Sequence, residues 1–137
     1  PTQGTVFLST HDRDKQALVP IAARLIELGF DVTATSGTAQ ALANAGLKVQ
    51  SVLKVHEGRP NIEDQIRSNQ VQLVINTPIG RQAAHDDKYL RRAALDYAVP
   101  TVTTLAGARA AVEAISALQQ QPRLRIHALQ DVHAMQR

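Results

Sequence analysis

Short apolar runs alternate along this chain with segments in which apolar residues recur every three or four positions. The first pattern is typical of buried strands, and the second of helices that pack on one face. We expect strands at residues 6–8, 30–33, 49–53, 71–75 and 100–103. We expect helices at residues 18–28, 38–45, 61–68, 86–97 and 106–118. Strands that alternate with helices are joined by right-handed crossovers. The prediction is therefore an α/β fold: a three-layer, Rossmann-like open parallel sheet of about five strands with helices on both faces.

Several local signals bear on the boundaries of these elements. The run at 71–75 is almost continuously apolar, which favours the centre of the sheet. Pro20 lies inside a helical pattern and predicts a late helix start or a kink. Asp86 and Asp87 are expected to cap the fourth helix. Pro122 is expected to end the fifth, leaving a tail with one more short strand at 124–127.

The chain has 137 residues, an ordinary length for one domain. We expect a single domain over residues 1–137, with an α/β core at about 4–121 and a C-terminal tail at 122–137. The sequence begins with Pro1 rather than Met, and the first expected strand follows almost at once. We therefore expect a piece of a larger chain.

The composition argues against several classes of function. Cys is absent and the five His show no tight ligand spacing, so neither a disulfide framework nor a metal site is expected. There is no Trp, and two Phe and two Tyr supply little base stacking, while the formal charge of +3 is scattered. The composition therefore favours a small anion over nucleic acid as the ligand. No apolar run approaches the roughly 20 residues that span a bilayer, so we expect a cytoplasmic protein without a membrane partner.

A hydroxyl-rich turn, Thr35-Ser36-Gly37-Thr38, stands where the second strand should pass into a helix. Backbone N–H groups at a helix start, three hydroxyls and the positive end of the helix dipole suit a phosphate group. The alternative is a plain helix cap at Ser36.

Other polar residues follow the ends of further expected strands: Lys15, Lys54 and Asn76-Thr77. The carboxyl ends of parallel strands share one edge, so these side chains should converge with the turn. Each has an ordinary alternative, a solvated lysine or a turn before proline. The stretch 54–60 is rich in charge but bracketed by Gly and Pro, which predicts a shaped loop or simply a solvated one.

Two clusters could transfer protons: His11-Asp12 and His85-Asp86-Asp87. Neighbours in sequence rarely pair in this way, and helix capping is the stronger reading for Asp86 and Asp87. These two clusters alone therefore give little support for a catalytic role.

Seven segments of the sequence match the pattern of one known family: 9–15, 34–39, 54–62, 74–77, 80–81, 91–95 and 103–105. With these segments the sequence resembles the carboxy-terminal allosteric domain of the carbamoyl-phosphate synthetase large subunit, which has a methylglyoxal-synthase-like fold. The likeness covers nearly the whole chain, and the run from Lys54 to Asn61 is its most specific part.

The resemblance implies that the domain binds UMP as an inhibitor and IMP at an overlapping site. Lys15, Thr35, Thr38 and Lys54 would contact phosphate and ribose, and Asn76 would line the pocket. The full set of expected nucleotide- and phosphate-binding residues is Ser9, Lys15, Thr35, Ser36, Gly37, Thr38, Lys54, Asn76 and Thr77.

Ornithine is implied as an activator, with Thr103 near its region and the main ornithine site outside this domain. Pro78 departs from the family pattern, which often has a threonine there. Because proline has no side-chain donor, the preference between UMP and IMP stays open.

The resemblance also implies that catalysis takes place outside this chain. The domain itself would need no cofactor, while ATP and a divalent metal would serve the parent ligase. Expected partners are the catalytic domains of the same large subunit and the glutaminase small subunit, and a homo-oligomer is a further option. Such a domain would control carbamoyl phosphate supply for pyrimidine and arginine biosynthesis.

Two other readings stay open. One is an enzyme similar to methylglyoxal synthase, which eliminates phosphate from dihydroxyacetone phosphate. Glu57-Gly58-Arg59-Pro60 replaces the stretch that supplies that enzyme's catalytic aspartate, which disfavours this reading. The other is an interaction module without a ligand.

Overall fold

The structure is a computed structural model that describes residues 2–77 and 81–136, without the side chains of Asp12, 81–87 and 121–136. Strands and helices alternate along the chain. The strands are β1 (Thr5–Thr10), β2 (Asp31–Thr35), β3 (Gln50–Val52), β4 (Leu73–Thr77) and β5 (Thr101–Val102). The α-helices are α1 (Lys15–Glu27), α2 (Ser36–Asn44), α3 (Ile62–Arg67), α4 (Arg81–Asp96) and α5 (Leu105–Gln136). Two short 3₁₀ turns, η1 (Asp12–Asp14) and η2 (Val55–Glu57), follow β1 and β3.

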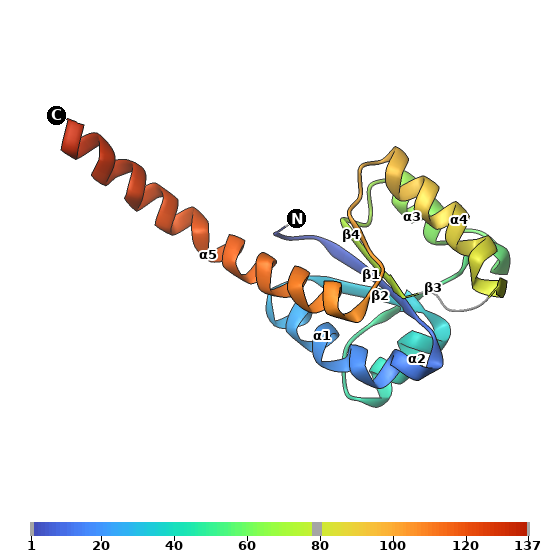
Figure 1. Cartoon of the computed structure of the whole chain (residues 1–137). Helices are drawn as coiled ribbons and strands as arrows, with labels where there is room; N and C mark the ends of the chain where they lie inside the picture. The colour runs from blue at the N-terminus through green and yellow to red at the C-terminus, as the bar shows by residue number, and fades with distance from the viewer. Residues whose placement is uncertain (1, 78–80, 137) are drawn as a thin grey trace.

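The five strands form one sheet in the order β3-β2-β1-β4-β5, and every neighbouring pair is parallel. Helices α1, α2 and α5 cover one face of the sheet, and α3 and α4 cover the other (Figure 1). This arrangement confirms the three-layer α/β prediction. β4 is an interior strand, but the middle position belongs to β1 rather than to the run at 71–75. Burial on both faces distinguishes an interior strand from an edge strand and does not identify the middle one.

The two faces of the sheet are packed by alternate residues of the same strands. In β1, Val6 and Leu8 join the core beneath α1, α2 and α5, while Phe7 joins the core beneath α3 and α4. In β4, Ile75 belongs to the first core and Val74 to the second. This period of two explains why strands that are buried on both faces are apolar throughout.

The predicted C-terminal strand at 124–127 is wrong, because α5 continues through Pro122 to Gln136. Figure 1 shows this helix extending well beyond the body of the domain. A proline inside a helix costs about 3 kcal/mol, and the Leu, Gln, Arg and Ala residues on both sides are good helix formers that offset part of this cost. No helix within residues 2–77 and 81–136 is long and apolar enough to cross a membrane.

Two predicted helix starts are also wrong. α1 begins at Lys15, so Pro20 lies inside the helix and does not delay its start. α4 begins at Arg81, so Asp86 and Asp87 lie within the helix and do not cap it. In both cases helix-forming residues precede the presumed start signal and extend the helix toward the N-terminus.

Candidate functional site

The order of the strands reverses between β1 and β4. From β1 the chain adds β2 and β3 on one side, and it then returns to add β4 and β5 on the other. In open parallel sheets a crevice forms at such a reversal, outside the carboxyl ends of the strands, and ligands bind there. The strand register places Ser9 beside Asn76 and Thr10 beside Thr77 at this point. Three of the predicted site residues, Ser9, Asn76 and Thr77, therefore lie together.

Threonine side chains are hydrogen-bonded to one another and to the backbone at this edge of the sheet. The Thr38 hydroxyl lies 3.4 Å from both the backbone N and the backbone O of Thr10, accepting from the first and donating to the second. The Thr35 hydroxyl donates to it at 3.5 Å, and the hydroxyls of Thr10 and Thr77 are hydrogen-bonded to each other. Thr35 and Thr38 are only 3% and 1% exposed. These hydroxyls join β1, β4 and the start of α2, a structural role that the sequence did not reveal.

The first turn of α2 has no cap from its own N-terminal neighbour. Thr35 is the N-cap residue, in an extended backbone conformation, and its side chain makes no capping hydrogen bond. Ser36 is the first residue of the helix, so the plain cap at Ser36 is not what the structure contains. Backbone N–H groups at such a helix start are suited to an anion.

Lys15, the first residue of α1, reaches this helix start. Its Nζ lies 3.0 Å, and its Cε 3.8 Å, from the position that a Cβ on Gly37 would occupy. An ammonium group therefore lies beside the positive end of the α2 dipole. An ammonium group beside a helix N-terminus suits a negatively charged ligand.

Lys54 lies at the same edge, two positions after the last residue of β3. β3 is the neighbour of β2, with Val52 opposite Thr35. Lys54 is exposed, and its backbone N donates to Glu57 Oε1 at 2.7 Å. The topology thus agrees with the predicted placement of Lys54 beside the turn at 35–38.

Thr103 lies elsewhere on the edge. It follows β5, whose Val102 is paired with Ile75, and it lines a hollow with Arg91, Leu95, Val99 and Thr101 between α4 and β5. Strands β4 and β1 separate it from β2 and the start of α2. The Pro78 departure from the family pattern lies outside the described residues.

His11 pairs with Asp14, an aspartate that was not among the candidate residues. Its Nε2 lies 2.8 Å from Asp14 Oδ2, and Asp14 N donates to His11 O at 3.1 Å across the η1 turn. The side chains of Asp12 and of the His85-Asp86-Asp87 cluster lie outside the described part. The i, i+3 spacing within a turn is the signal that could have indicated the His11–Asp14 pair. Among the side chains that are described, no group of three His, Asp or Glu residues is arranged to hold a metal ion.

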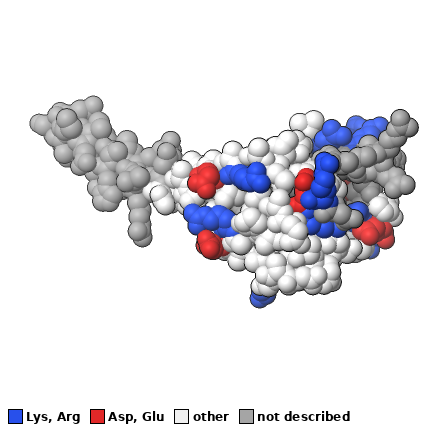
Figure 2. All heavy atoms as spheres, turned by 60° about the horizontal axis from the view of Figure 1, so that its bottom comes forward, with Lys and Arg blue, Asp and Glu red and all other residues white. Residues whose placement is uncertain are grey.

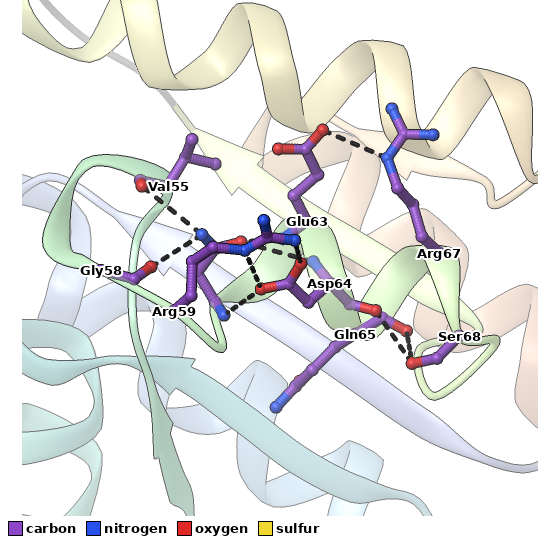
Figure 3. Close-up of polar contacts among 9 residues, drawn as sticks. Val55, Gly58, Arg59, Glu63, Asp64, Gln65, Arg67 and Ser68 are labelled. Atoms are coloured by element: carbon purple, nitrogen blue, oxygen red, sulfur yellow. Dashed lines mark hydrogen bonds and ion pairs between the residues drawn. The ribbon is translucent and has the colours of Figure 1, made fainter.

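The charge-rich loop at 54–60 is shaped, as predicted. Its hydrogen bonds meet at the start of α3, where Asp64 accepts from Arg59 at 2.6 Å and from the backbone N of Asn61 at 2.8 Å (Figure 3). Both contacts lower the pKa of Asp64, the arginine contact most.

Figure 2 shows Lys and Arg side chains gathered at the right-hand end of one face, with fewer Asp and Glu among them. Such a surface attracts small anions.

The model of a known family, the MGS-like domain, matches residues 17–103, more than half of the chain. The carbamoyl phosphate synthase large chain of Acidobacterium capsulatum is 50% identical over 134 residues, which are 98% of this chain and 12% of that protein. The C-terminal section of the large chain from Methanopyrus kandleri is 46% identical over 97% of this chain and 24% of its own length. This chain thus spans only a small part of the curated relatives that it matches.

A solved structure, the methylglyoxal synthase of Elizabethkingia anophelis NUHP1, superposes with a TM-score of 0.65 over 82% of this chain and 78% of that one. The two sequences are 20% identical, so this likeness supports the fold alone. The relatives confirm the resemblance to the carbamoyl phosphate synthase large chain. With its five parallel strands and its match to the family model, the chain belongs to the MGS-like domain family.

Proposed function

We propose that this chain is the regulatory domain of a carbamoyl phosphate synthase large chain and that it binds UMP or IMP at the carboxyl edge of its sheet. The observation that carries this proposal is the Lys15 ammonium group beside the uncapped start of α2. The identity of about half over nearly the whole chain to a carbamoyl phosphate synthase large chain supports the choice of parent enzyme.

The phosphate group would lie at the first turn of α2. The backbone N–H groups of Ser36, Gly37 and Thr38 and the ammonium of Lys15 would surround it, which provides charge-assisted hydrogen bonds. Lys54 would approach from the end of β3. Ser9, Asn76 and Thr77 would line the crevice where the nucleoside lies, because an amide offers both a donor and an acceptor to a sugar or a base.

Regulation would follow from differential binding. UMP would favour one arrangement of the full enzyme and ornithine, bound near Thr103 and the adjoining domains, would favour another. A coupling free energy of about 1 to 3 kcal/mol is typical of such systems. The change of arrangement would act on the catalytic domains of the large chain, which would use ATP and a divalent metal, and on the glutaminase small subunit. The whole enzyme would work in the cytoplasm. Pyrimidine and arginine biosynthesis would draw on the product.

The lyase alternative needs a carboxylate free to remove a proton next to a carbonyl group. In the loop at 54–60 and its flank, Glu57 already accepts from the backbone of Lys54, and Asp64 is held by Arg59. A lowered pKa makes Asp64 a weaker base. These contacts favour a binding domain over a lyase.

Isothermal titration calorimetry of the 137-residue chain with UMP, IMP and inorganic phosphate tests the proposal. We expect a nucleotide to bind and Lys15→Ala to weaken it by about 10- to 100-fold, as for loss of a hydrogen bond to a charged group. Lys48→Ala is the matched control, since Lys48 is exposed at the opposite, amino end of β3. Binding of none of the three ligands would favour the interaction module. Turnover of dihydroxyacetone phosphate would favour the lyase.

A further inference from the structure

We propose that Glu57 and Asn61 are positioning residues that hold the loop at 54–60 closed, so that Lys54 is presented at the end of β3. This inference depends on the proposed function, in which Lys54 contacts the bound phosphate ligand. Neither residue needs to touch the ligand itself.

The loop is closed at its base. Leu53, which precedes it, forms a parallel bridge with Asn61, which follows it. The backbone N of Ile62 donates to the backbone O of Leu53 at 2.9 Å. The two ends of the loop therefore lie side by side, between the end of β3 and the start of α3. This contact fixes the backbone position from which Lys54 extends.

Glu57 holds both backbone polar groups of Lys54. Its Oε1 accepts from Lys54 N at 2.7 Å, and its own N donates to Lys54 O at 3.0 Å. Lys54 has an extended backbone conformation between these contacts. With both peptide groups held, the Cα–Cβ bond of Lys54 has one direction, and only the side-chain torsions remain free.

Asn61 connects the far side of the loop to α3. Its side chain is buried, with 4% exposure of the residue, and its Nδ2 donates to Gly58 O at 2.8 Å and more weakly to Val55 O at 3.5 Å. Its Oδ1 accepts from the backbone N of Glu63 at 2.9 Å and of Asp64 at 3.3 Å (Figure 3). One buried amide thus satisfies groups of the loop and of the first helical turn together.

Most residues of the loop are not part of the core. Val55 is half-buried and packs against the core beneath α3 and α4. The remaining loop residues are exposed: Lys54, His56, Glu57, Gly58, Arg59 and Pro60. Fixing each backbone residue costs conformational entropy, and exposed residues recover little of this cost by burial. A fixed backbone at the ligand edge favours presentation of the lysine, since less backbone freedom is lost on binding.

Titration calorimetry with UMP on wild type, Lys54→Ala, Glu57→Ala, Glu57→Gln and the double variant Lys54→Ala/Glu57→Ala tests the inference. We expect Glu57→Ala to weaken binding by about three- to tenfold through lost preorganisation, and Glu57→Gln, which keeps an acceptor oxygen, to restore it. Adding Glu57→Ala to the Lys54→Ala variant should change the affinity no further, because Glu57 acts through Lys54. A merely structural role would weaken both backgrounds alike.

Hydrogen exchange of the Lys54 amide gives a readout that needs no ligand. The amide should exchange faster in Glu57→Ala than in wild type or in Glu57→Gln. Wild-type affinity in Glu57→Ala, or equal losses in both backgrounds, would overturn the inference and leave nucleotide binding intact. Wild-type affinity in Lys54→Ala would overturn it as well, by removing Lys54 from the site. If wild type does not bind UMP or IMP, the proposed function itself fails.

Discussion

Replacing Gly37 with alanine should move stability and ligand affinity in opposite directions. Gly37 is the second residue of α2 and is not among the glycines with positive φ, so alanine can adopt its helical backbone. The new Cβ would lie 3.0 Å from Lys15 Nζ, closer than ordinary van der Waals contact. The lysine tip must therefore retreat by a few tenths of an ångström from the start of α2.

The two effects have comparable sizes. Alanine in place of glycine in a helix adds about 0.5 to 1 kcal/mol of stability, because the unfolded chain loses freedom. A pair of unit charges loses about 0.7 kcal/mol when its separation grows from about 2.8 to about 3.2 Å at an effective dielectric constant of about 20. That loss corresponds to about a threefold weaker affinity for a phosphate ligand.

Urea unfolding and titration calorimetry with UMP measure the two quantities on the same sample. Ala43→Gly is the control, because Ala43 is exposed in α2 and belongs to its last turn. It should lower the stability by a similar amount and leave the affinity unchanged. If Gly37→Ala bound UMP as tightly as wild type, Lys15 would not approach the ligand at the start of α2. If Gly37→Ala unfolded at lower urea, the contact with Lys15 could not relax as described.

Three further substitutions test other parts of the structure by urea unfolding. Ile75→Ala should cost about 2 to 5 kcal/mol because its side chain is fully buried, whereas Leu95→Ala, at 80% exposure, should change stability by less than about 0.5 kcal/mol. Thr38→Val should cost about 1 kcal/mol, since it removes the hydroxyl that contacts both backbone groups of Thr10 at 3.4 Å. Asp64 has a lowered pKa in the fold, so its contribution is complete above its ordinary value of 3.8 and is lost as the pH falls through the lower folded value. Asp64→Asn should remove this part of the acid dependence, and an unchanged acid profile in that variant would contradict the assignment.

The arrangement of the sheet could be predicted because its signals are repeated and local. The interior strands β1 and β4 carry apolar residues on both faces, and each covered helix has one apolar face, so an error of a few residues at one boundary leaves the alternation intact. β2, for example, ends at Thr35 rather than at 33, and the next helix begins at Ser36 rather than at 38. The resulting strand ends still place the turn at 35–38 and Asn76 on the same edge.

Single residues were weaker guides where several forces compete. A proline marks a helix end only if the flanking residues do not sustain the helix, and α5 continues through Pro122. The partner of His11 depends on the η1 turn, which brings Asp14 to the imidazole. The bonds of Thr38 to Thr10 depend on the approach of α2 to β1, which the sequence pattern alone does not specify.

The same threonine contacts connect the start of α2 to the strand on the far side of the reversal. Thr38 belongs to the first turn of α2, Thr10 to the middle strand, and Thr77 to the strand on the far side of the reversal. Their hydrogen bonds form a continuous connection from the start of α2 to β4. β4 is paired with β5, and the hollow that contains Thr103 lies beside β5. These hydrogen bonds therefore connect the start of α2, where we propose that the phosphate group binds, to the strand next to β5.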